Sequence, residues 1–116
     1  MKILRSSRAR RNIAIAGSAF VEIAIGLRGR LGPGVAVETL RNILILAGRL
    51  REIPLTSKIL YEGLKLEEKI GVKNLYDCLH ASTALSHDGI IVSNDTFYDR
   101  IEGLIRISLK EYARKI

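Results

Sequence analysis

The stretch from Leu75 to Arg100, LYDCLHASTALSHDGIIVSNDTFYDR, decides the fold of this chain. Its first half predicts a helix from Leu75 to Ser86, with Asn74 as the N-cap. Residues 87–89 (HDG) predict a turn. Gly89–Ser93 is a short apolar run rich in β-branched residues, which predicts a buried strand.

Two acids flank this strand, and each has an ordinary structural explanation. Asp77, at the third position of its helix, favours the helix dipole. Asp95, just past the strand, can cap a helical turn over Thr96–Arg100. Ligands of open α/β sheets, however, bind outside the carboxyl ends of strands, which makes Asp95 a candidate site residue as well. The weaker candidates beside it are Ser93, Asn94 and Asp99.

A third acid, Glu22, lies in an apolar part of the chain. Ile13–Gly17 (IAIAG) predicts a buried strand, and Ser18 is expected to cap a helix over residues 19–28 (AFVEIAIGLR). Because burying an unpaired carboxylate is costly, Glu22 must meet a metal, a cation or water in a cleft. The structural alternative is an ion pair with Arg28 or a neighbouring arginine.

The remaining elements complete an alternating pattern. The expected elements are a break at residues 31–34, a helix at 35–50, a strand at 51–55, a helix from the Thr56 cap to Ile70, a stop at Gly71, a strand at 104–109 and a polar, basic tail at 110–116. Helices separate most of the strands. The sequence therefore predicts an α/β fold with a parallel sheet and helices on both faces.

Composition places the chain among soluble globular proteins. Its 116 residues, 47% hydrophobic and 27% charged, suit one domain rather than a disordered chain. The single cysteine, Cys78, rules out an internal disulfide or a cysteine zinc site and favours a cytoplasmic protein. No apolar run reaches the roughly 18 residues of a membrane span. A signal peptide is not expected either, because Glu22 interrupts the first apolar segment.

The net charge of +7 is concentrated at the start of the chain, where residues 1–30 hold seven basic residues and one acid. A clustered basic surface favours a polyanion such as nucleic acid. A solvated basic face explains the same charge, and both interpretations stay open. The candidate RNA-binding residues are Arg8, Arg10, Arg11, Arg28 and Arg30.

If Glu22, Asp77 and Asp95 converge, they form an oxygen-rich anionic site. Hard cations such as Mg²⁺ or Mn²⁺ suit these ligands, and a phosphodiester suits the basic surroundings. His80 follows Asp77 by three residues and is expected to hydrogen-bond to it in a supporting role.

Five segments together resemble a known family. They are SAFVEIAIGLR (18–28), IPLTSKILYEGLKLEEKIG (53–71), YDCLHASTAL (76–85), IIVSNDTFYDRI (90–101) and GLIRI (103–107). Over about residues 13–109 they resemble the PIN domain, and most closely the VapC-type toxin ribonucleases of toxin–antitoxin pairs. The helix YDCLHASTAL followed by a strand and SND is the most specific part.

The resemblance implies a three-layer α/β/α fold with a central parallel sheet. Such proteins gather four acids at the carboxyl edge of the sheet, bind Mg²⁺ or Mn²⁺ and hydrolyse RNA. Glu22 matches the second acid, Asp77 the third and Asp95 the fourth, while Ser93 matches a hydroxyl residue before the fourth. The resemblance also implies a homodimer and a small VapB-type antitoxin partner.

The chain departs from the family pattern at its start. The family begins with a central strand that ends in the first catalytic Asp, and no acid precedes Glu22 here. We therefore expect this strand to be missing, with residues 1–12 as a basic remnant of the first helix region, 13–109 as the core and 110–116 as the tail. Three hypotheses follow: an endoribonuclease, intact or impaired; a non-catalytic protein that binds RNA or an antitoxin; and a structural oligomerisation domain.

Overall fold

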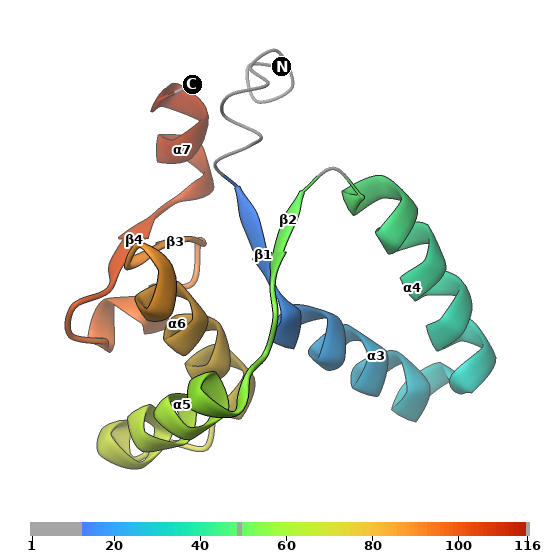
Figure 1. Ribbon diagram of the computed structural model, residues 1–116, viewed down its shortest axis with the longest axis horizontal. Helices are drawn as coiled ribbons and strands as arrows, with labels where there is room; N and C mark the ends of the chain where they lie inside the picture. The colour runs from blue at the N-terminus through green and yellow to red at the C-terminus, as the bar shows by residue number, and fades with distance from the viewer. Residues whose placement is uncertain (1–12, 49, 116) are drawn as a thin grey trace.

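Parallel strands alternate with helices throughout the part of the chain that the computed structural model describes, residues 13–48 and 50–115 (Figure 1). Strand β1 (Ala14–Ala16) pairs with β2 (Arg51–Ile53), and β3 (Ile90–Val92) pairs with β4 (Ile105–Ile107). Both pairings are parallel. The predicted α/β class is confirmed.

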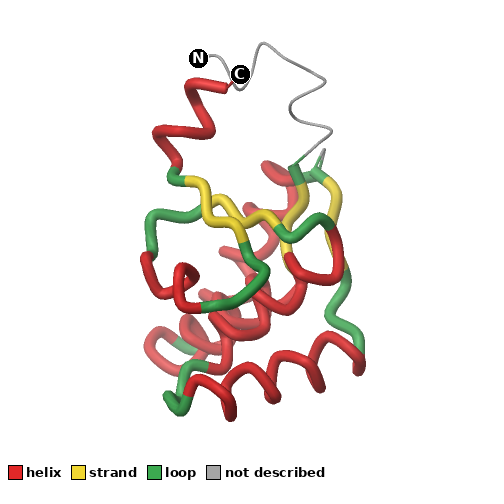
Figure 2. Tube along the Cα trace, turned by 90° about the vertical axis from the view of Figure 1, so that its left-hand side faces the viewer, coloured by secondary structure: helices red, strands yellow, loops and turns green. Residues whose placement is uncertain are grey.

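The strands form two separate two-stranded sheets, whereas the sequence predicted one central sheet. Figure 2 shows them as two groups of strands. Within the described residues, no strand lies between β1 and β3. Instead both strands line a groove of about 840 Å³ with mostly apolar walls.

Helix α6 (Leu75–His87) joins the two sheets. It packs against β1 and β3, and also against α3 (Gly17–Leu31) and α5 (Ser57–Ile70). Its buried residues are Cys78, Leu79, Ala81, Ser82 and Thr83. The Ser82 hydroxyl donates to the Ile59 carbonyl at 2.9 Å, which ties α6 to α5.

The helix α4 (Pro33–Ala47) packs mainly on α3, and the hairpin that they form extends away from the α5–α6 pair (Figure 1). Several large apolar side chains of this hairpin are exposed, notably Leu31, Val37, Leu44, Ile45 and Leu46. None of the described helices is long and apolar enough to cross a membrane.

Local chemistry explains most helix ends. The Thr56 hydroxyl accepts a hydrogen bond from the Ile59 amide at 3.2 Å, as the cap prediction requires. Gly71 ends α5 with a φ of 83°, a conformation that favours glycine. Asn74 occupies the predicted N-cap position of α6, but its side chain makes no capping bond.

The predicted cap at Ser18 is wrong. The helix α3 begins two residues earlier than predicted, at Gly17, with Ala16 as the N-cap residue. Gly17 approaches the β2 chain so closely that an added Cβ would lie 3.0 Å from the Leu55 nitrogen and 3.2 Å from the Ile53 oxygen. Ser18 is thereby buried inside the fold.

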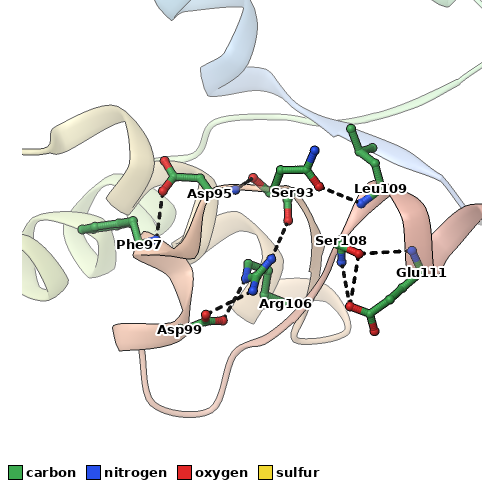
Figure 3. A network of polar contacts seen from close by, with 9 residues as sticks. Ser93, Asp95, Phe97, Asp99, Arg106, Ser108, Leu109 and Glu111 are labelled. Atoms are coloured by element: carbon green, nitrogen blue, oxygen red, sulfur yellow. Dashed lines mark hydrogen bonds and ion pairs between the residues drawn. The ribbon is translucent and has the colours of Figure 1, made fainter.

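The tail forms a helix that the sequence analysis missed, α7 (Leu109–Lys115). Its start is a capping box. The Glu111 amide donates to the Ser108 hydroxyl at 3.1 Å, and the Ser108 amide donates to the Glu111 carboxylate at 3.4 Å (Figure 3). The pattern Ser-x-x-Glu at residues 108–111 is the sequence signal that indicates the start of this helix. Between β3 and β4, residues Thr96–Arg100 form the short 3₁₀ helix η1.

The close approach at Gly17 predicts that Gly17→Ala will lower the free energy of unfolding by about 1–3 kcal/mol, because the methyl group meets rigid backbone atoms. Gly26→Ala, in the exposed middle of α3 with open space around it, is the matched control and should stabilise by up to about 1 kcal/mol. Urea denaturation measures both. Equal stabilities for the two variants would contradict the packing at Gly17.

Candidate functional site

Tyr98 lies at the centre of the candidate site. Its residue surface is 4% exposed, and it packs with Ala81 and Ile101 in the core. Its hydroxyl donates to Asp77 Oδ1 at 3.1 Å. Burial raises the pKa of Tyr98 far above its ordinary value, and the negative charges of Asp77, Asp95 and Glu22 raise it further. Of the three acids, Asp77 is the one that the structure places in hydrogen-bond contact with this hydroxyl.

The three acids belong to different elements. Glu22 lies in the second turn of α3, directly after β1. Asp77 lies in the first turn of α6. Asp95 follows β3, caps η1 by accepting a hydrogen bond from the Phe97 amide at 2.9 Å, and donates its own amide to Ser93 Oγ at 3.1 Å (Figure 3). Two of the acids therefore follow strands, as the sequence indicated.

His80 contacts Glu22, so the predicted bond to Asp77 is wrong. Its Nε2 lies 3.0 Å from Glu22 Oε1 and its Nδ1 lies 2.6 Å from Ser18 Oγ. The reason is tertiary, because α3 packs against α6 and brings its first two turns to the imidazole ring. Asp77 instead accepts its hydrogen bond from the Tyr98 hydroxyl.

The charge of the three acids is poorly balanced. Within the described residues, none of them forms an ion pair with a lysine or arginine, and the one basic side chain that contacts any of them is His80, at Glu22. Carboxylate oxygens suit a hard divalent cation. Their spacing does not fit a metal ion as well as their chemistry does. In the described part of the chain, no three His, Cys, Asp or Glu side chains lie close enough together to hold a metal ion. The donor chemistry fits a cation, and the arrangement is not a finished three-ligand site.

The weaker candidates have structural partners (Figure 3). Asp99 forms a two-pronged ion pair with Arg106 at 2.9 and 3.2 Å, and the hydrogen bonds from Arg106 lower the pKa of Asp99. Asn94 Oδ1 accepts a hydrogen bond from the Leu109 amide at 3.1 Å, which helps to anchor α7. Neither side chain joins the three acids through a hydrogen bond.

The basic residues lie apart from the acids or outside the described residues. Arg28 and Arg30 are in the last turn of α3, about two helical turns beyond Glu22. Arg30 Nε donates to the Gly26 carbonyl at 3.4 Å. Arg8, Arg10 and Arg11 fall in residues 1–12, which the structure does not describe.

Comparison with known proteins decides the family, because the PIN domain family model matches residues 2–104. The chain belongs to the PIN domain family. No curated protein matches it.

Solved structures with the same fold come from VapBC complexes. One is VapBC2 from Rickettsia felis bound to a DNA fragment from its promoter, with 25% identity and a TM-score of 0.60 over 83% of this chain and 74% of the other. A second is DNA-bound VapBC from Salmonella typhimurium, with 19% identity and a TM-score of 0.61 over 82% and 74% of the two chains. The predicted resemblance to a VapC-type PIN domain is confirmed.

The buried hydroxyl of Tyr98 predicts that Tyr98→Phe will destabilise the PIN domain by about 1–2 kcal/mol, because Asp77 loses a donor. Tyr61→Phe is the matched control, since Tyr61 is 61% exposed, and it should change stability by less than about 0.5 kcal/mol. Chemical denaturation compares the two variants. A Tyr98→Phe variant as stable as the wild type would show that the bond to Asp77 contributes nothing.

The raised pKa of Tyr98 predicts a loss of stability in alkaline solution. The unfolded chain releases this phenol proton near pH 10, whereas the folded chain retains it, so the free energy of unfolding must fall as the pH rises above 10. In an absorbance titration, one phenol should stay protonated well above pH 10 while the protein is folded, and Tyr98→Phe should lack it. Ionisation of every tyrosine near pH 10 in the folded protein would contradict the described burial of Tyr98.

Proposed function

We propose that this PIN domain is a VapC-type toxin that cleaves RNA as an endoribonuclease dependent on Mg²⁺ or Mn²⁺. The observation that supports the proposal is the set of three acids, Glu22, Asp77 and Asp95, around Tyr98 without a lysine or arginine partner among the described residues. Like charges on neighbouring elements repel one another, and a bound divalent cation would relieve that repulsion.

The three acids are the proposed ligands of the cation. When bound, the cation would activate a water molecule and stabilise the charge that develops on the phosphate. Ser93 supports Asp95 by accepting a hydrogen bond from its amide, which fixes the backbone at the end of β3. Tyr98 keeps its proton because its pKa is raised, and it therefore serves as a hydrogen-bond donor to Asp77 rather than as a base.

A second candidate function is a non-catalytic PIN domain that binds RNA or an antitoxin. It is favoured by the spacing of the acids, since no three candidate ligands in the described residues are close enough to hold a metal ion. The two candidates differ in one measurable property, metal-dependent cleavage.

The proposed partners follow from charge, surface and relatives. RNA suits the net charge of +7, with Arg28 and Arg30 as described contacts and Arg8, Arg10 and Arg11 as further ones. A VapB-type antitoxin is proposed because similar structures are VapBC complexes. A homodimer is proposed because the resemblance to VapC-type toxins implies one. Exposed Ile45 and Leu46, which are 72% and 85% accessible, are apolar groups that a protein partner would cover. A cytoplasmic location suits these partners.

The proposed nuclease predicts Mn²⁺-dependent cleavage of RNA that EDTA abolishes. Asp77→Asn and Asp95→Asn should each lower the cleavage rate by about 100-fold or more, because each removes a ligand worth several kcal/mol of transition-state stabilisation. Glu68→Gln, on the exposed surface of α5, is the control and should cleave like the wild type. Labelled RNA resolved on a gel measures the rates. RNA binding without cleavage by the wild-type protein would support the non-catalytic candidate.

A further inference from the structure

The side chain of His80 bridges two residues of α3. Its Nδ1 lies 2.6 Å from Ser18 Oγ, and its Nε2 lies 3.0 Å from Glu22 Oε1. Ser18 is completely buried, the His80 side chain is 14% exposed, and the Glu22 side chain is 47% exposed. A line of hydrogen bonds thus runs from the interior of the protein to a half-exposed carboxylate.

The chemistry of the three side chains determines which atom donates in each of these hydrogen bonds. A carboxylate accepts hydrogen bonds and donates none. The proton of the bond between the two side chains therefore sits on His80 Nε2, which donates to Glu22. Nδ1 is held by the Ser18 hydroxyl, which sets the rotation of the imidazole ring. Ser18 is itself fixed, because Gly17 before it lies tightly against the β2 chain. The ring therefore has a rigid support on the side away from Glu22.

We propose that His80 is a positioning residue, which holds the Glu22 carboxylate in the orientation that binds the divalent cation, and that Ser18 fixes the His80 ring. This inference rests on the metal-dependent function proposed above. A half-exposed glutamate loses considerable rotamer freedom when it binds a ligand, and a hydrogen bond that already restrains it reduces that loss. With Oε1 held by His80, Oε2 would be the oxygen left to bind the cation.

The same helix positions two acids. Asp77 and His80 are three residues apart on α6, so they share one helix face. Asp77 is a proposed ligand in its own right, whereas His80 acts on Glu22 across the contact between α6 and α3. A shift of α6 against α3 would therefore move both acids relative to each other.

Calorimetric titration of the full chain with Mn²⁺ tests the proposal. His80→Leu should weaken Mn²⁺ binding by about 10- to 100-fold, the usual effect of removing a hydrogen-bond partner of a metal ligand. His80→Gln should largely restore the affinity, because its amide can place an N–H donor where Nε2 stands. Ser18→Ala should weaken binding as well, by up to about 10-fold. His87→Gln changes the other histidine, which is exposed at the end of α6, and should bind like the wild type.

A second readout needs no metal. In ¹⁵N NMR spectra of the histidine rings, His80 should carry a proton on Nε2, and Glu22→Gln should shift the signal of that nitrogen. Circular dichroism establishes that each variant is folded; should His80→Leu not fold, Ser18→Ala decides the question. Equal Mn²⁺ affinity in the wild type, His80→Leu and Ser18→Ala would overturn this inference and leave the proposed function standing. If the wild-type protein binds no Mn²⁺ at millimolar concentration, the proposed metal site and this inference both fail.

Discussion

The packing of α6 against both pairs of strands holds this fold together. Residues 78–83 carry small or slender side chains at the buried positions, including Ala81, Ser82 and Thr83, which allow α5, β1 and β3 to approach closely. The polar ones among them satisfy their hydrogen bonds locally: Thr83 donates to the Leu79 carbonyl at 2.8 Å, and Ser82 donates to Ile59. In the part of the chain that the structure describes, no buried side-chain nitrogen or oxygen lacks a hydrogen-bond partner, which helps to keep such a buried helix stable.

The candidate site is built at the ends of the elements that α6 joins. Each acid has one donor from the protein: an imidazole for Glu22, a phenol for Asp77 and a backbone amide for Asp95. Such donors lower the cost of gathering negative charges without cancelling those charges, which remain to attract a cation. The arrangement therefore combines rigidity with unbalanced charge, and both properties are useful for binding a metal and a phosphate.

The sequence predicted the parallel strands and the Thr56 cap, because these depend on local pattern and on the alternation of strands and helices. The convergence of Glu22, Asp77 and Asp95 stays a prediction. The partner of His80 was not predictable, since it depends on how α3 lies against α6. The helix α7 carried a signal at Ser108 and Glu111, but the charged composition of the tail obscured it. The division of the described strands into two sheets was not predictable either, because strand pairing depends on tertiary packing that no local pattern reports.

The division into two sheets has a consequence for solubility. A two-stranded sheet exposes two edges, so the two sheets together present four rows of unpaired backbone groups, whereas one continuous sheet presents two. Residues of all four strands line the apolar groove, where another chain could add a strand by backbone pairing at an open edge. Leu109 and Tyr112 of α7 line the same groove, so this helix occupies part of the space that an added strand would need.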